Sequence, residues 1–158
     1  SGPPGSRVGR DRLDGAISAL ARGVASLRVV RGDYTYASGL SAVREILAGG
    51  RPDAIVACND AMALGCIDAL RPAGIQVPRD VSVVGFDDFA PSAWREYELT
   101  TVRQPLGGMA EVAVKRLLDV ADIASVRVEV AGTIVVRRSA RLAEDDARFV
   151  ERGPRSQA

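Results

Sequence analysis

The chain has 158 residues, and its 21 basic and 20 acidic residues leave a formal net charge of +1. This length fits about one domain, and the balanced charge gives no overall field that would draw the chain to nucleic acid or a membrane. The chain contains no histidine, so it lacks the commonest general base and metal ligand. We therefore predict no cofactor and no metal site.

The first half of the chain predicts helices that alternate with short strands. Apolar residues repeat about every three to four positions in the helices, and short apolar runs mark the strands. The expected elements are a helix over 7–22 with Leu13, Ile17 and Leu20 on one face, a strand over 27–30, a helix over 38–47, a strand over 54–58 and a helix over 60–70.

The second half continues this alternation and adds a hairpin. The expected elements are a strand over 81–86, a short helical turn over 89–94, an extended segment over 99–103, a helix over 107–120 with Val112, Leu117 and Val120 facing inward, and strands over 126–130 and 133–136. Ala131 and Gly132 predict a tight turn between the last two strands. Together the elements predict an α/β fold, a doubly wound parallel sheet with helices on both faces.

The two ends of the chain carry further expectations. Ser1–Gly5 looks like the exit from a strand into the first helix, but no strand precedes it. A doubly wound sheet usually has that strand near its middle, so we interpret the chain as a piece of a longer protein. The last residues, 141–158, are mostly charged or polar. They are predicted to form a disordered tail because they offer little to bury.

The cysteines and the hydropathy pattern indicate a soluble protein of a reducing compartment. Cys58 and Cys66 fit no zinc or redox spacing, and we expect both to pack as small apolar residues. No apolar run approaches the roughly 18 residues of a membrane span, and no signal peptide opens the chain. We expect a cytoplasmic location and no membrane partner.

Polar residues follow two of the predicted strands at the point where each strand ends. Asn59 and Asp60 follow one strand, and Asp87 and Asp88 follow the next. Open α/β sheets bind ligands outside the carboxyl ends of their strands, so these side chains are candidates to contact one small polar molecule. Either Asn59 or Asp60 could instead cap the following helix. Asp60 is the better cap by position, which leaves Asn59 freer to bind. Asp87 or Asp88 could cap the turn at Phe89, and the pair permits a division in which Asp88 caps and Asp87 binds.

Five stretches of the chain carry distinctive residues. They are S-G-P-P-G-S and R-L-D-G within 1–15, G-D-Y-T-Y-A-S-G over 32–39, P-D-A-I-V-A-C-N-D-A-M-A-L-G over 52–65, V-P-R-D-V-S-V-V-G-F-D-D over 77–88 and L-T-T-V-R-Q-P over 99–105. In order and spacing they resemble the effector-binding region of the LacI/GalR family of bacterial transcriptional regulators. Such regulators have an N-terminal helix-turn-helix and a periplasmic-binding-protein-like fold of type I, in which an effector binds between two α/β subdomains.

The resemblance implies that 1–140 form an incomplete effector-binding domain, mainly one of its two subdomains. About 1–99 and 124–140 correspond to the second subdomain, and about 100–123 to a returning strand and helix of the first. DNA would be bound only through a helix-turn-helix outside this chain. Glu98 stands where the family usually has proline, and Pro72 interrupts a stretch that is normally helical. Neither departure falls on the expected cleft.

The resemblance also implies a set of ligand-facing residues. A guanidinium such as that of Arg12 can donate several hydrogen bonds to hydroxyls or a carboxylate, and the ring of Tyr34 can stack on a sugar or a purine. Polar groups of the Asn59 and Asp87 type can pair with adjacent hydroxyls or ring nitrogens. A solvated helix face for Arg12 and core packing for Tyr34 are the alternatives. The implied set is Arg12, Tyr34, Asn59, Asp87 and Gln104.

The resemblance further implies a homodimer and a regulatory function. The helix that carries Met62, Leu64 and Ile67 resembles the dimer-forming element, although packing into the chain's own core would explain the same apolar stripe. The implied function is that of the sensory part of a repressor that binds a sugar or a purine-like effector. A periplasmic sugar-binding protein of an ABC importer is the alternative. Catalysis is not predicted, because the chain has no nucleophile, phosphate-loop or metal motif.

Overall fold

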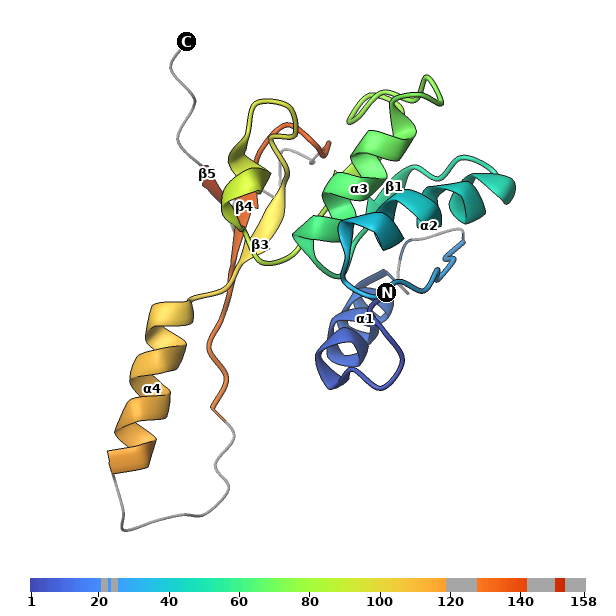
Figure 1. The fold of residues 1–158 in the computed structure, drawn as a ribbon. Coiled ribbons are helices and arrows are strands. Elements are labelled where there is room, and N and C mark those ends of the chain that lie inside the picture. Colours follow the sequence, from blue (N-terminus) through green and yellow to red (C-terminus); the bar gives the residue numbers. More distant parts are fainter. Residues whose placement is uncertain (21–22, 24–25, 119–127, 142–149, 153–158) are drawn as a thin grey trace.

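The computed structural model describes residues 1–20, 23, 26–118, 128–141 and 150–152. The helices are α1 (Arg7–Leu20), α2 (Tyr36–Ala48), α3 (Asp60–Leu70), the short 3₁₀ helix η1 (Ala90–Ala93) and α4 (Leu106–Leu118), and Figure 1 shows them in chain order. The strands are β1 (Ala54–Val56), β2 (Ser82–Val84), β3 (Thr101–Arg103), β4 (Thr133–Val136) and β5 (Val150–Arg152). No helix in these ranges is long and apolar enough to cross a membrane.

Helices α2 and α3 lie side by side because each presents a glycine to the backbone of the other. A Cβ on Gly39 would lie 2.2 Å from the carbonyl oxygen of Met62, and a Cβ on Gly65 would lie 2.2 Å from that of Tyr36. Only a residue without a Cβ permits this approach. The glycines therefore determine the distance between the two helices.

The core lies between this helix pair and the strands β1 and β2. Helix α3 has buried residues on nearly every side, as expected of a helix whose sequence is apolar all round. Leu70 at its end is fully buried, together with Val81, Val83 and Leu99 from the segments beneath it. The core therefore supports the segments that follow β1 and β2, and the candidate site lies in these segments.

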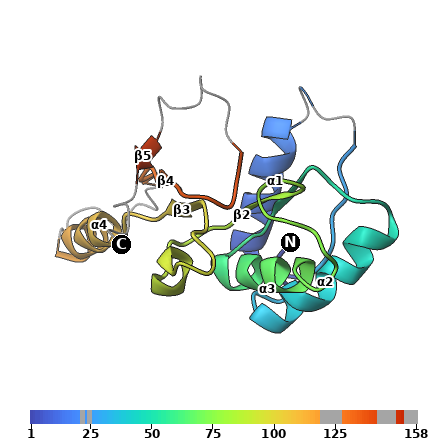
Figure 2. The ribbon, with the colours of Figure 1, turned by 90° about the horizontal axis from the view of Figure 1, so that it is seen from above.

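Two small sheets follow one another along the chain. Strands β1 and β2 are parallel, and parallel bridges from Val84 to Thr100 and from Asp87 to Arg103 extend this pairing toward β3. Strand β3 pairs with β4 in the antiparallel sense, and β4 pairs with β5 in the parallel sense. Seen from above, α1 lies on the opposite side of β2 from α2 and α3 (Figure 2).

Several predicted elements differ from those in the structure. The predicted strand over 27–30 is not formed, and the strands at 54–58 and 81–86 are shortened to three residues each. The predicted hairpin at Ala131-Gly132 is wrong, because 128–130 form no strand and β4 pairs with β3 instead. Gly132 passes beside the end of β3, where a Cβ would lie 3.0 Å from the Arg103 carbonyl oxygen. Residues 126–127 lie outside the described ranges.

The apolar faces predicted for α1 and α4 are not covered by the described residues. On α1 only Gly9 is buried, and Ile17 is 39% exposed. On α4 no residue is buried, and Leu117, which was predicted to face inward, is 80% exposed. Val112 is half-buried, and Val120 lies outside the described ranges. Figure 1 shows α4 extending away from the α2–α3 pair, which explains the exposure.

The C-terminal segment also departs from its prediction in part. Val150–Arg152 form β5 within the segment predicted to be a disordered tail, and they pair with β4. The remaining residues of that segment beyond 141 lie outside the described ranges.

Candidate effector-binding site

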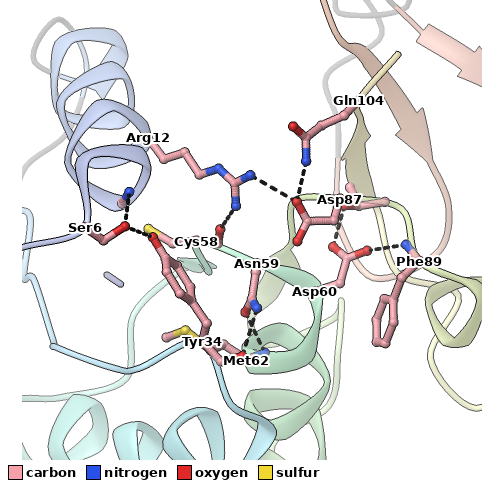
Figure 3. Close-up of polar contacts among 12 residues, drawn as sticks. Ser6, Arg12, Tyr34, Cys58, Asn59, Asp60, Met62, Asp87, Phe89 and Gln104 are labelled. Atoms are coloured by element: carbon pink, nitrogen blue, oxygen red, sulfur yellow. Dashed lines mark hydrogen bonds and ion pairs between the residues drawn. The ribbon is translucent and has the colours of Figure 1, made fainter. Parts of the chain in front are cut away.

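The candidate site lies where the chain leaves β1 and β2. Because these strands are parallel, their carboxyl ends fall at the same edge of the sheet. The backbone N–H of Asp60 donates to the carbonyl oxygen of Phe86 at 2.9 Å, which joins the start of α3 to the segment that follows β2. Helix α1 carries Arg12 over this edge, as Figure 3 shows. Three separate elements therefore meet at one place.

Three of the predicted ligand-facing residues, Arg12, Asp87 and Gln104, are brought together. Arg12 Nη2 lies 3.0 Å from Asp87 Oδ1, and Gln104 Nε2 donates to the same oxygen at 2.7 Å. The other end of the Arg12 guanidinium donates to the Cys58 carbonyl oxygen at 2.6 Å, and the group lies 3.9 Å from the centre of the Phe86 ring. Arg12 is 16% exposed in its side chain, so it is held at the edge rather than on a solvated helix face.

Asp87 keeps one carboxylate oxygen available. Both Arg12 and Gln104 donate to Oδ1, and no described residue donates to Oδ2. Partial burial raises the pKa of Asp87, the neighbouring charge of Arg12 opposes this change, and the negative charge of Asp60 adds to it. The net result is a pKa above the usual range of an aspartate. The group can accept a hydrogen bond from a ligand, and it takes up a proton at a higher pH than an exposed aspartate does.

Asn59, contrary to prediction, is the N-cap of α3. Its backbone is extended, with φ −155° and ψ 168°, and its Oδ1 accepts from the Met62 N–H at 3.0 Å. Its Nδ2 donates to the Tyr34 carbonyl oxygen at 2.9 Å. Asp60 could not cap because it already lies in the first helical turn. Asn59 therefore stands at the edge of the site with both ends of its amide engaged in the fold.

The Tyr34 side chain lies against the N-terminal part of α1. Its hydroxyl lies 2.9 Å from Ser6 Oγ, and a Cβ on Gly9 would lie 2.5 Å from the same hydroxyl. The half-buried ring therefore packs against the start of α1, and its contact with a ligand stays a prediction. Its backbone has φ 71°, which is uncommon for a residue other than glycine. Tyr34 contacts the site through its carbonyl oxygen and Asn59.

Asp60 is a buried carboxylate whose role the sequence did not reveal. It is 1% exposed, and it accepts hydrogen bonds from Thr101 Oγ1 at 2.5 Å, Ser92 Oγ at 2.6 Å and the Phe89 N–H at 3.2 Å. A Cβ on Gly85 would lie 2.2 Å from its Oδ1. Asp60 thus ties the start of α3 to the turn after β2 and to β3. Its partners lie 29 to 41 residues away, so no local pattern could predict them.

The division in which Asp88 caps the turn at Phe89 is not found, because no side chain caps that turn. Its Oδ2 accepts from Arg103 Nε at 2.7 Å, and its Oδ1 accepts from Arg137 Nη2 at 2.6 Å. Burial acts to raise the pKa of Asp88, but the hydrogen bonds and charges of the two arginines outweigh it and lower the pKa. The pKa values of the two adjacent aspartates are therefore shifted in opposite directions. Asp88 is fully engaged within the chain, whereas Asp87 is not.

The predicted dimer-interface residues are part of this chain's own core. Met62, Leu64 and Ile67 are 4%, 5% and 4% exposed, and all three belong to the cluster formed around α3. Their apolar stripe is covered by α2 and by the strands, because α3 lies between them. These side chains leave little surface for a second subunit, and the core-packing alternative describes them.

The sequence pattern of the periplasmic binding protein-like domain matches residues 1–140. The chain belongs to this family. The solved structures that it resembles include LacI-family regulators. One is the E. coli sugar-binding transcriptional regulator complexed with phosphate, with a TM-score of 0.79 and 33% identity over 88% of this chain and 52% of that one. The partial α/β domain predicted from the sequence is thereby confirmed as periplasmic-binding-protein-like.

Curated relatives of this chain include transcriptional repressors. The ribose operon repressor of Escherichia coli strain K12 is 36% identical over 124 residues, which are 75% of this chain and 37% of the repressor. The transcriptional repressor PurR of Salmonella heidelberg is 34% identical over 122 residues, which are 75% of this chain and 36% of the repressor. The chain thus spans little more than a third of the length of these relatives.

Two further structures show the same likeness. The regulator CelR in complex with cellobiose has a TM-score of 0.82 and 34% identity, over 89% of this chain and 45% of CelR. The lac repressor dimer bound to operator and an anti-inducer has a TM-score of 0.81 and 31% identity, over 89% of this chain and 50% of the repressor. The predicted resemblance to the LacI family is confirmed.

Proposed function

We propose that this chain is the ligand-sensing part of a LacI-type transcriptional regulator. The single observation that carries the proposal is the cluster of Arg12, Asp87 and Gln104 at the carboxyl edge of β1 and β2. This is the place where open α/β sheets bind small ligands. The relatives are repressors, and this supports a regulator over the binding protein of an importer.

The proposed effector is a neutral molecule with several hydrogen-bond donors, such as a sugar or a purine. Asp87 offers its Oδ2, which can only accept while the carboxyl group is ionised. Arg12 is already paired with Asp87 and with the Cys58 carbonyl oxygen, so its charge is largely neutralised. The buried Asp60 adds a negative charge close by. This half of the site therefore favours hydroxyl or N–H donors over a phosphorylated or carboxylated ligand.

The proposed response passes from Asp87 to strand β3. The backbone N–H of Asp87 donates to the Val102 carbonyl oxygen at 2.9 Å, and Gln104 just beyond β3 donates to the Asp87 side chain. A ligand held by Asp87 is thus coupled to the strand that we assign to the crossing between subdomains. To regulate, the ligand must bind one arrangement of the subdomains more tightly than the other.

The proposed organisation of the whole regulator follows the family. Residues of about 1–99 and 124–140 form the second subdomain, and about 100–123 the returning strand and helix of the first. DNA is bound through a helix-turn-helix that is not in this chain, and the working form is a cytoplasmic homodimer. The lac repressor that resembles this chain is a dimer on its operator, which supports this assignment. The protein binds its effector and does not convert it.

The test uses the full-length regulator and calorimetric titration with D-ribose, cellobiose and hypoxanthine. We expect one class to bind and to change the affinity for operator DNA. Asp87→Asn should weaken that ligand about ten-fold or more, because a hydrogen bond to a charged group contributes about 1.5–3 kcal/mol. Asp11→Asn on the exposed side of α1 is the matched control, since the side chain of Asp11 is 68% exposed. Asp11→Asn should leave the affinity unchanged.

Two outcomes would contradict the proposal. Binding that leaves operator affinity unchanged would remove the regulatory claim and favour a transport protein. Equal loss of ligand affinity in Asp87→Asn and Asp11→Asn would mean that the Arg12–Asp87–Gln104 cluster is not the site.

A further inference from the structure

The turn that carries Asp87 has an unusual backbone. Asp87 has φ 125° and Asp88 has φ 55°, in a region that residues with a side chain seldom adopt. Two such residues in succession persist only where surrounding contacts hold them. Arg12 and Gln104 hold the side chain of Asp87 from one direction, but they do not contact Asp88.

Asp88 is held from a different direction by two arginines. Arg103 Nε lies 2.7 Å from its Oδ2, and Arg137 Nη2 lies 2.6 Å from its Oδ1. The side chains of Asp88 and Arg137 are only 7% and 13% exposed, so water weakens this pair much less than it weakens surface pairs. Arg103 is 44% exposed, so its pair with Asp88 is more open to water. Each carboxylate oxygen thus has its own charged donor.

The arginine that reaches Asp88 from outside β3 is itself anchored. Arg137 Nη1 donates to the Leu99 carbonyl oxygen at 2.7 Å, and the Arg137 backbone N–H donates to Thr100 Oγ1 at 3.0 Å. Arg137 follows β4, and Leu99 and Thr100 precede β3. The carboxylate of Asp88 is therefore fixed to the paired strands β3 and β4 rather than to a mobile side chain.

We propose that Asp88 is a positioning residue, whose pairs with Arg103 and Arg137 hold the strained turn and thereby aim the open oxygen of Asp87 at the effector. This inference rests on the function proposed for the Arg12–Asp87–Gln104 site. Asp88 does not touch the ligand. It acts through the backbone that it shares with Asp87, while Arg12 and Gln104 act on the Asp87 side chain.

The charges around the two carboxylates agree with this division. Asp87 faces Arg12 of α1, Gln104 beyond β3 and Asp60 of α3, and its pKa is raised. Asp88 faces Arg103 and Arg137, which lower its pKa. The positioning group therefore stays ionised at a pH at which the ligand-facing group begins to take up a proton.

The test is an NMR comparison of this chain with its Asp88→Asn variant. Asparagine tolerates positive φ about as well as aspartate, so the substitution removes the charge and leaves the conformational preference. We expect the amide exchange of Asp87, whose N–H bonds to Val102, to accelerate about ten-fold or more. The three-bond coupling that reports the φ of Asp87 should change as well. Core amides such as that of Val83 should keep their exchange rates.

Two further variants separate positioning from general destabilisation. Arg138→Gln is the matched control, because Arg138 is 82% exposed and pairs with Glu98 only at 3.5 Å; it should leave Asp87 unchanged. Arg137→Gln should reproduce part of the effect of Asp88→Asn, because it removes the more buried of the two pairs and leaves the pair with Arg103. The double variant should add little to Asp88→Asn, which already breaks both pairs. Arg137→Lys keeps the charge, so the Asp87 amide should be better protected from exchange in it than in Arg137→Gln. The comparison of these two variants provides the measurement if Asp88→Asn does not fold.

The inference is overturned if the exchange and coupling of Asp87 are the same in the parent chain, Asp88→Asn and Arg137→Gln. These measurements need no effector, so they are independent of whether the proposed function is correct. In the full-length regulator, Asp88→Asn should also weaken the ligand identified by titration about ten-fold. An unchanged affinity together with a loosened turn would equally reject the positioning role, and would leave the proposed function standing.

Discussion

Helices α3 and α4 are of similar length and rich in apolar residues, yet they differ in how much of their surface is buried. Helix α3 buries eight of its residues between α2 and the strands, whereas α4 buries none. Leu70 at the end of α3 is fully buried, and Leu117 near the end of α4 is 80% exposed. The difference shows that an apolar sequence produces a helix but does not supply the surface that covers it. The candidate site depends on the covered helix.

The largest effect on stability should come from shortening a buried side chain of α3. Leu70→Ala should lower the free energy of unfolding by about 2–5 kcal/mol, because it removes transfer energy and leaves a cavity. Chemical denaturation of the parent chain and the variant measures the change. A loss below about 1 kcal/mol would mean that neighbouring side chains move in to fill the cavity left by Leu70, or that the α2–α3 layer is packed less tightly than the structure indicates.

The next effect concerns the buried thiol of α3. Burial raises the pKa of the Cys66 thiol to about 11, against 9.0 for a thiol in an unfolded chain. Between these values the unfolded chain loses the thiol proton while the folded chain keeps it, so stability should fall as the pH rises from about 9 to about 11. The loss should reach about 2–3 kcal/mol.

Cys66→Ala isolates this contribution from the other groups that titrate at high pH. The difference in pH dependence between the parent chain and Cys66→Ala is the measured quantity.

A cysteine placed on α4 by Leu118→Cys should react with iodoacetamide at the ordinary rate of an exposed thiol, because Leu118 is 74% exposed. Equal rates of reaction with iodoacetamide at Cys66 and at the cysteine introduced by Leu118→Cys would remove the contrast between α3 and α4.

A smaller effect is expected at the start of α3. Asn59→Ala removes the N-cap, which should cost about 1 kcal/mol of stability. Asn59→Asp keeps an acceptor for the Met62 N–H and should retain most of the stability, although it loses the donor to the Tyr34 carbonyl oxygen. Denaturation of the three chains side by side gives the comparison. Equal stability of Asn59→Ala and the parent would mean that α3 needs no cap.

The smallest effect is expected on α4. Leu117→Ala should change stability by no more than about 0.5 kcal/mol, as is usual for an exposed position. It is the matched control for Leu70→Ala, since both variants remove the same atoms from a helix end. A loss comparable to that of Leu70→Ala would show that Leu117 is covered in solution by a surface other than those described.

The sequence predicted the helices better than the strands and their partners. The 3.6-residue repeat placed α2, α3 and α4 within two residues of their bounds, because this period arises within the helix itself. Strand pairing depends on distant segments, so β4 was paired with the wrong neighbour. The same limit applies to burial: Ile17 and Leu117 have the pattern of a core face, but only tertiary contacts decide whether a face is covered.

The candidate site was also predictable only in part, because some of its contacts depend on distant segments of the chain. Arg12, Asp87 and Gln104 were expected to face one ligand, and they meet within 3.0 Å of one oxygen atom. The roles of Asn59 and Asp60 were exchanged, because both residue types favour helix starts and the sequence alone does not show which one lies outside the first turn. The partners of Asp88 come from β3 and from the residue after β4, and no pattern near Asp88 pointed to them.

The sequence by itself determined the family, the helices and the polar residues at the ends of the strands, since each rests on local patterns or on ordered stretches of similar residues. Only the tertiary structure decided which aspartate is left open and which is held by arginines. Two neighbouring residues of the same type are indistinguishable until distant parts of the chain bring different partners to each. Those partners bond to one oxygen of Asp87 and to both oxygens of Asp88.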